Sequence, residues 1–169
     1  MPPLLSFLLG EKVKILLAAA VLVGLGCAWL WRPERQVRLH QRHFLNAAEN
    51  RDWPKIKAIL DDGFRTPYGH DKPIALALMA EGLRPFFALQ IFDSETEVTV
   101  SGRDGAVRTR LRFSGTGMAL AEIVQGAVND SREPFEFTWR RQSWKPWDWR
   151  LVSASHPLMA HASGQLPSL

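Results

Sequence analysis

The sequence predicts an α+β domain behind an N-terminal transmembrane helix. Three observations carry this prediction: an uncharged apolar run from Ile15 to Trp31, helical spacing of apolar residues through the first half of the remainder, and alternation with period two through the second half. Helices that precede antiparallel strands are expected to cover one face of a sheet. We therefore divide the chain into a tail with anchor over 1–33, one domain over 34–157, and a loose tail over 158–169.

The apolar run ILLAAAVLVGLGCAWLW matches a membrane-spanning helix. At a rise of about 1.5 Å per residue it spans roughly 26 Å, close to the thickness of the hydrocarbon core. Trp29 and Trp31 fall at one end, where indole rings favour the membrane interface. The alternatives are a cleaved signal peptide, for which no Ala-x-Ala site follows the run, and a lipoprotein signal, for which Cys27 lacks a Leu three residues earlier. We expect an uncleaved, single-pass anchor.

The side of the membrane that the domain occupies is left open by two opposed arguments. The positive charges flanking the run favour the cytoplasm, with Lys12, Lys14 and the α-amine on one side against Arg32, Arg35, Arg38 and Arg42 on the other. However, these arginines begin the first predicted helix of the domain, and a short tail followed by one anchor commonly exports a domain. We expect the extracytoplasmic (periplasmic) side.

Composition narrows the chemistry of the domain. The chain is 46% hydrophobic and 22% charged, which is typical of a globular protein. Its net charge of +4 is spread among alternating basic and acidic residues, so a solvated surface is expected. The single cysteine, Cys27, lies in the predicted anchor, and this leaves the domain without a disulfide or a thiolate.

Three helices are predicted in the first half of the domain. The first covers Glu34 to Asn50, because its apolar residues share one face. The second begins at Asp52-Trp53-Pro54, with Asp as N-cap and Pro in the first turn, and closes at Asp62. The third is predicted from Lys72 to about Phe87, with Asp71 as its N-cap and Pro85 ending or kinking it.

The second half is predicted to form two hairpins around a short helix. Residues 96–101 and 107–113 alternate on either side of a glycine-containing turn at 102–105. Residues 120–127 return to helical spacing, and residues 135–140 and 149–153 alternate again around a tryptophan-rich turn. The residues from His156 onward are expected to be a loose tail.

In pattern and order, the segment from Glu34 to Pro157 resembles the nuclear transport factor 2-like (NTF2-like) superfamily, which includes SnoaL-like and ketosteroid-isomerase-like proteins. The resemblance rests on the first helix, AENRDWPKIKAILDDGF from Ala48 to Phe64, the third helix after Tyr68-Gly-His-Asp71, and the final hairpin ending WDWRLVSASHP. It implies a cone-shaped fold with a pocket between the helices and a curved antiparallel sheet, and commonly a homodimer.

The polar residues beside aromatic ones are the candidates for a site in that pocket, namely Trp53, Tyr68, His70 and Trp139 as ligand contacts. Tyr68 and Asp71 could also polarise a carbonyl and move a proton, as in ketosteroid-isomerase-like enzymes. The simpler interpretation makes Asp71 an N-cap, His70 a loop residue and Tyr68 a packing ring. No strand position offers a buried carboxylate, so no catalytic residue is assigned.

The remaining features have structural interpretations. The tryptophans of the last hairpin either form a stacking platform or pack the sheet against the helices; Trp144 and Trp147, at the turn, join Trp29 and Trp31 as candidate contacts with a partner or the membrane interface. Arg108, Arg110 and Arg112 form a basic stripe that neighbouring glutamates offset. No metal-ligand spacing, cofactor motif or nucleic-acid motif is present.

The sequence therefore predicts a membrane-anchored, bacterial-type accessory or scaffold module that binds a small apolar ligand or a membrane-protein partner without turning it over. The alternative is a small-molecule isomerase or dehydratase that uses Tyr68 and Asp71. The predicted partners are the lipid bilayer, such a ligand or protein, and a second copy of the chain, with no metal and no cofactor.

Overall fold

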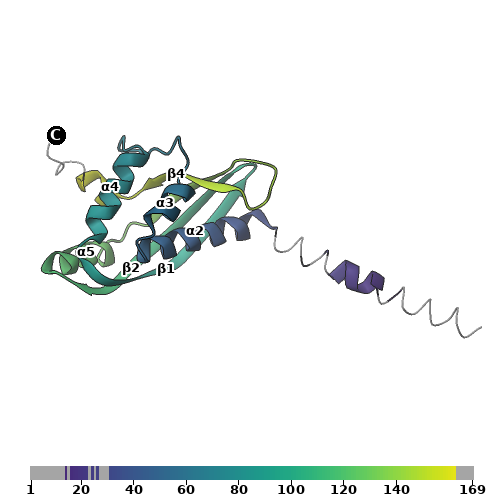
Figure 1. The fold of residues 1–169 in the computed structure, drawn as a ribbon, viewed down its shortest axis with the longest axis horizontal. Coiled ribbons are helices and arrows are strands. Elements are labelled where there is room, and N and C mark those ends of the chain that lie inside the picture. Colours follow the sequence, from purple (N-terminus) through teal and green to yellow (C-terminus); the bar gives the residue numbers. More distant parts are fainter. Residues whose placement is uncertain (1–13, 15, 23, 25, 27–30, 163–169) are drawn as a thin grey trace, which may run out of the picture.

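The computed structural model describes residues 14, 16–22, 24, 26 and 31–162, and its domain is an antiparallel sheet with helices packed on it (Figure 1). The element order begins with helices and continues with strands, as the sequence predicts. The elements are α2 (Pro33–Glu49), α3 (Trp53–Ile59), α4 (Lys72–Leu83), β1 (Phe86–Ser101), β2 (Asp104–Gly117), α5 (Ala119–Asn129), β3 (Phe135–Arg141), β4 (Trp149–Ser155) and α6 (Pro157–Ala162).

Helices α3 and α4 both begin at an aspartate that caps them. The carboxylate of Asp52 accepts from the backbone N–H of Lys55 at 3.1 Å, and the carboxylate of Asp71 accepts from Ile74 at 3.1 Å. Each pair satisfies one of the amide donors that a helix start leaves free. Both caps confirm the interpretation made from the sequence.

Helix α4 ends at Leu83, and the prediction that it continues to Phe87 is wrong. Arg84 is still helical in geometry, but Pro85 comes next and has no backbone N–H to continue the helical hydrogen bonds. The chain enters β1 at Phe86, whose carbonyl accepts a hydrogen bond from the guanidinium of Arg51. This contact ties the start of the sheet to the loop between α2 and α3.

The sheet has the order β1-β2-β3-β4, and all neighbours are antiparallel. The first hairpin is much longer than predicted, because β1 and β2 extend to Phe86 and Gly117. A bulge interrupts β1 between Ser94 and Glu97, where Glu95 adopts a φ of 52°. The polar run around this bulge breaks the apolar alternation, and for this reason the first half of β1 escaped prediction.

A second bulge lies in β4. Thr138 pairs with Ser153 while Trp139 pairs with Leu151, so Val152 is an extra residue. Strict alternation over residues 149–153 would turn Ser153 inward, but the bulge moves the next buried position from Ser153 to Ala154.

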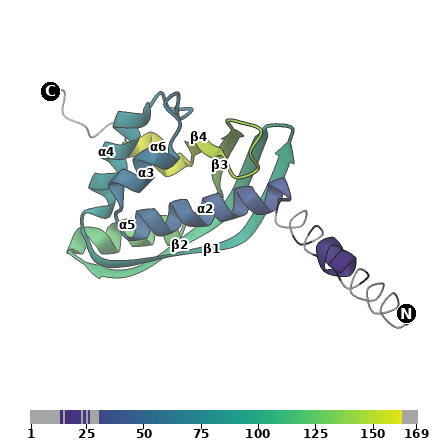
Figure 2. The same cartoon turned by 45° about the vertical axis from the view of Figure 1, so that its right-hand side comes forward.

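Helix α2 lies along the sheet, and Figure 2 shows α3, α4 and α6 grouped over one end of the layer, away from the start of α2. At the start of α2, Val37 packs over Gly105 and Trp149; a Cβ added at Gly105 would lie 2.8 Å from Val37 Cγ2. Trp139 is fully buried beneath α2, and its indole N–H donates to Gln41 Oε1 at 3.1 Å.

At the C-terminal end the structure differs from the prediction, and at the N-terminal end the structure describes only part of the predicted anchor. The expectation of a loose tail after His156 is wrong for residues 157–162, which form α6. Within the described part of the chain, no helix has both the length and the apolar character needed to cross a membrane. The predicted anchor is described only at 16–22, 24, 26 and 31, and Trp29 falls outside the described residues.

Candidate ligand cavity

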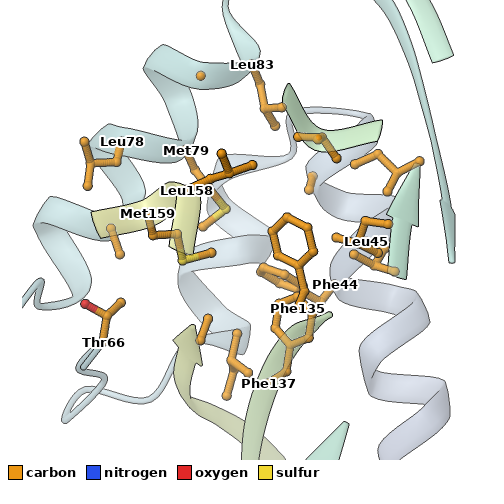
Figure 3. Close-up of a pocket in the computed structure, with 18 of the residues that line it drawn as sticks. Phe44, Leu45, Thr66, Leu78, Met79, Leu83, Phe135, Phe137, Leu158 and Met159 are labelled. Atoms are coloured by element: carbon orange, nitrogen blue, oxygen red, sulfur yellow. The ribbon is translucent and has the colours of Figure 1, made fainter. Parts of the chain in front are cut away.

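A cavity of about 250 Å³ lies between the sheet and the helices at the end of the layer where α4, α5 and α6 meet (Figure 3). Its lining is apolar except for Thr66 and His70. The other lining residues are Phe44, Leu45, Ala48, Leu60, Phe64, Ala75, Leu78, Met79, Gly82, Leu83, Ile91, Leu111, Phe113, Val124, Val128, Phe135, Phe137, Leu151, Ala154, Leu158 and Met159.

The cavity wall combines aromatic rings on one side with a helix that carries both large and small residues on the other. Aromatic rings of the sheet and α2 form one wall, with Phe44 and Phe137 in an edge contact at 5.8 Å between ring centroids. On α4 the wall includes Ala75 and Gly82, and a Cβ added at Gly82 would meet no atom within 4 Å. There is thus room for a larger side chain at this position of the cavity wall.

The two polar lining residues come from one tight loop between α3 and α4. The backbone N–H of Thr66 donates to the carbonyl of His70 at 2.9 Å, and the N–H of His70 donates to Thr66 Oγ1 at 3.1 Å. Gly69 supplies the left-handed backbone at φ 87° that closes this loop. The loop thus holds the side chains of Thr66 and His70, 6% and 7% exposed, against the cavity.

The His70 side chain carries a buried nitrogen, Nε2, that has no hydrogen-bond partner within the described residues. A buried polar atom without a partner costs about 1–3 kcal/mol. The ring of Tyr68 lies 6.3 Å from the His70 ring, tilted by 45°, on the same loop. Together, Thr66 and His70 form one polar spot on an otherwise apolar wall.

Helix α6 closes the cavity with Leu158 and Met159, and His156 fixes where this helix begins. The Nδ1 atom of His156 accepts from the N–H of Leu158 at 3.2 Å, and its Nε2 lies 3.2 Å from the carbonyl of Glu133. Its ring stacks on Phe135 with centroids 3.8 Å apart. Burial lowers the pKa of His156, and the hydrogen bond to Glu133 opposes that shift only in part.

The structure separates the residues that the sequence grouped as one site. Of the candidate ligand contacts, His70 lines the cavity, whereas Tyr68 stands behind it in the loop. Trp53 lies beside a separate surface hollow with Leu76, and Trp139 is buried under α2, outside the lining of either space. Asp71, paired with Tyr68 in the enzyme interpretation, caps α4.

Several residues of the cavity had no signal in the sequence. Thr66 is one polar residue in a turn-rich loop, and Leu158 and Met159 lie in the segment expected to be loose. An apolar pair after His156-Pro157 was the available hint, since a proline in the first turn is a common helix start. The open space beside Gly82 is likewise a matter of three-dimensional packing, which no spacing rule detects.

Acidic residues are absent from this site. Among the described residues, no aspartate or glutamate lines the cavity, and none is buried elsewhere. No group of three His, Cys, Asp or Glu side chains in the described part of the chain is placed to hold a metal ion. The described lining of the cavity therefore offers a ligand hydrogen-bonding groups but no carboxylate that could act as a base.

The opposite end of the layer exposes aromatic and basic side chains. Trp31, Trp144 and Trp147 are 52%, 83% and 54% exposed. The β3–β4 loop that carries two of them lies beside the start of α2, as both ribbon views show (Figures 1 and 2). On the outer face of the sheet, Arg108 and Arg110 pair with Glu136 and Glu95 at 3.0 and 3.2 Å, which agrees with a charge-balanced stripe.

Comparison with solved structures identifies the fold. No protein-family model matches the sequence, and no curated protein is similar to it. Solved structures do match. An NTF2-like family protein from Streptomyces avermitilis, named as a candidate dehydratase, has a TM-score of 0.53 and 19% identity over 72% of this chain and 93% of its own.

Two further structures give the same agreement. An NTF2-like protein of unknown function from Pseudomonas putida KT2440 has a TM-score of 0.53 and 15% identity over 72% of this chain and 82% of its own. Bd1075 from Bdellovibrio bacteriovorus has a TM-score of 0.53 and 12% identity over 72% of this chain. The match covers only 38% of the length of Bd1075. The chain therefore has the α+β fold of the NTF2-like proteins, with helices packed on a four-stranded antiparallel sheet.

Proposed function

We propose that the domain is a non-catalytic module that binds a small, largely apolar ligand in the cavity between α4, α6 and the sheet. The observation that carries this proposal is the lining: among its residues, only Thr66 and His70 bear polar side chains. Apolar cavities of this kind bind apolar molecules because water gains few hydrogen bonds inside them.

The size of the cavity limits the ligand. Its volume of about 250 Å³ exceeds the roughly 150 Å³ of an apolar cavity that accepts benzene, and lies below the range of about 300–1,000 Å³ typical of drug-sized ligands. A ligand with two fused rings or a medium-length alkyl chain matches this volume. We use the two-ring hydrocarbon 2-methylnaphthalene as the test probe.

The arrangement of Tyr68 and Asp71 favours binding over turnover. A general base has to reach the reacting group with a free carboxylate, but Asp71 uses an oxygen to cap α4, and neither residue lines the cavity. The dehydratase name of the Streptomyces protein describes that protein, and the described residues of this chain place no acid–base pair of carboxylates in the cavity to match such chemistry.

The variant Gly82→Leu tests binding, because Gly82 lines the cavity and an added side chain there meets no atom within 4 Å of its Cβ, so we expect it to occupy part of the cavity. We expect 2-methylnaphthalene to raise the thermal midpoint of the full wild-type chain, followed by far-UV circular dichroism. At ten times its dissociation constant, a ligand that binds only the folded state stabilises it by about 1.4 kcal/mol. Gly82→Leu is expected to abolish this rise while folding normally.

The matched control is Gly126→Leu. Gly126 is also helical and also has open space around an added Cβ, but it does not line the cavity. The control should keep the full response to the probe. A wild-type chain with no response, or a Gly82→Leu variant that responds as strongly as the control, contradicts the proposal.

We also infer that the segment from Ile15 to Trp31 anchors the domain in a membrane, with the domain on the extracytoplasmic side. Support comes from its apolar, uncharged sequence and from the exposed Trp31, Trp144 and Trp147 near the end of the domain where α2 begins. Indole rings favour the interfacial region of a bilayer. The tether would hold that end of the domain toward the lipid.

Membrane attachment and sidedness have separate tests. The full chain should stay in the membrane fraction after alkaline carbonate washing, and a variant with Leu17→Lys and Leu22→Lys should be released from it. A reporter enzyme that works only outside the cytoplasm, fused after Leu169, should be active. Release of the wild-type chain contradicts the anchor, whereas an inactive reporter on a retained chain contradicts only the assigned side.

A further inference from the structure

We propose that the ligand of this cavity is an apolar molecule with one uncharged hydroxyl group, bound by His70 Nε2 and the hydroxyl of Thr66. This inference rests on the proposed binding function and specifies its ligand class. The juxtaposition that supports it is a buried imidazole nitrogen without a partner on the wall of an apolar cavity.

The loop geometry leaves His70 Nε2 available to a ligand. The contacts that shape the loop use backbone groups and Thr66 Oγ1, so they hold the residue without engaging Nε2. His70 is 7% exposed, and its Nε2 is buried. Because His70 lines the cavity and Nε2 is shielded from bulk water, we expect a ligand atom in the cavity to satisfy this nitrogen.

Thr66 adds a second group at the same place. Its hydroxyl already accepts from the His70 N–H, and a hydroxyl carries one donor and two acceptor positions. The proton of Thr66 is thus free to point toward a ligand oxygen. In Figure 3 Thr66 lies at the edge of the lining, and in this view its oxygen is on the side away from the other labelled side chains, so we place its contact with the ligand at the rim of the cavity.

The chemistry of the lining selects a neutral group over a charged one. A neutral imidazole nitrogen is a donor or an acceptor according to its tautomer, and an alcohol or phenol can complement either form. Among the described residues, no lysine or arginine lines the cavity to stabilise a carboxylate, and a desolvated charge without a partner is strongly disfavoured. The rest of the ligand faces aliphatic and aromatic carbon, including Phe135 and Met79.

Three probes of similar shape test the proposal by calorimetric titration of the full chain: 2-naphthol, 2-methylnaphthalene and 2-naphthoate. We expect 2-naphthol to bind about three- to tenfold more tightly than the hydrocarbon, which is the size of effect expected for one net hydrogen bond. The anionic 2-naphthoate should bind more weakly than both.

Two variants assign the preference to the loop. His70→Phe should bind the hydrocarbon at least as tightly as the wild type and lose the preference for 2-naphthol. Thr66→Val should reduce the preference, and Thr66→Ser, which keeps the hydroxyl, should restore it. Retained binding of 2-methylnaphthalene shows in each case that the cavity is intact.

The outcomes distinguish this inference from the proposed function. If 2-methylnaphthalene and 2-naphthol bind equally well, the module binds apolar ligands but the polar spot does not select among them, and the inference is overturned. Tighter binding of 2-naphthoate, or an unchanged preference in His70→Phe, also overturns it. If none of the probes binds the wild-type chain, the proposed function fails together with the inference.

Discussion

The two ends of the layer between α2 and the sheet are built from the same class of apolar residues, yet one end is filled and the other is hollow. At the filled end, Val37, Gly105, Trp139 and Trp149 pack so closely that Gly105 has no room for a Cβ. At the hollow end, Gly82 faces open space beside the cavity. Apolar pattern thus decides which residues face inward, whereas side-chain volume decides whether they close the space.

The largest expected contrast comes from removing a side chain at each end. Trp139→Ala should lower the free energy of unfolding by about 3–5 kcal/mol, because it opens a cavity under α2 and leaves Gln41 Oε1 without its indole donor. Leu78→Ala, on the cavity wall, should cost about 1 kcal/mol or less, since the leucine already borders empty space. Urea denaturation measures both, and equal losses would contradict the contrast.

A smaller contrast comes from adding one methyl group at each end. Gly105→Ala should destabilise the domain by about 1–3 kcal/mol, because its Cβ would lie 2.8 Å from Val37 Cγ2 and 3.3 Å from Trp149 Cζ3. Gly82→Ala should stabilise it by about 0.5–1 kcal/mol, through better helix propensity with no clash. The same denaturation assay tests the pair, and a destabilising Gly82→Ala would mean that the hollow end is tighter than the distances indicate.

The filled end was the more predictable from the sequence. Alternation placed Trp139 and Trp149 on the inward face of the last hairpin, and both are buried. At both ends, local interactions were predictable: Asp52 and Asp71 marked two helix starts correctly, because an N-cap is an interaction between residues three apart. Such features depend on near neighbours in the chain.

The hollow end was less predictable, because it is assembled from segments far apart in the sequence. His70 was a candidate ligand contact on its residue type, but its partner Thr66 and the closing residue Met159 were not identified. The polar spot depends on the loop from Thr66 to His70 folding back on itself. The closure of the cavity by α6 depends on His156, which accepts a hydrogen bond at the start of that helix. Neither event leaves a periodic signal.

The stability of the hollow end, which α6 closes, is expected to depend on pH through His156. The folded-state pKa of His156 lies below the ordinary value of 6.5, so the unfolded chain binds more protons in the interval between the two values. The contribution of His156 to the free energy of unfolding is therefore greatest above pH 6.5 and falls as the pH drops through 6.5. Below the folded-state pKa of His156, this contribution falls no further. Protonation of Nδ1 also removes the acceptor for the Leu158 N–H.

The pH response can be assigned by substitution. His43, whose pKa is also lowered by burial, contributes in the same direction, so the comparison is made in a His43→Gln background. We expect the thermal midpoint to fall between pH 7.5 and pH 5, and His156→Phe, which can keep the stacking on Phe135, to flatten that fall. Asp62, held at a lowered pKa by its hydrogen bond to Lys72, adds its own loss only below about pH 4. An unchanged slope in His156→Phe would assign the response elsewhere.

The smallest expected effect on stability lies on the outside of the filled end. Trp144 is 83% exposed, whereas Trp149 in the adjoining strand is buried and donates its indole N–H to the carbonyl of Pro146 at 2.8 Å. Trp144→Ser should therefore change the free energy of unfolding by no more than about 0.5 kcal/mol. If Trp144 and Trp147 face the lipid, brominated phospholipids should quench the tryptophan fluorescence of the reconstituted full chain more than that of a Trp144→Ser, Trp147→Ser variant. Equal quenching would mean that this end of the domain stands clear of the bilayer, and the exposed pair would then be assigned to contact with another protein.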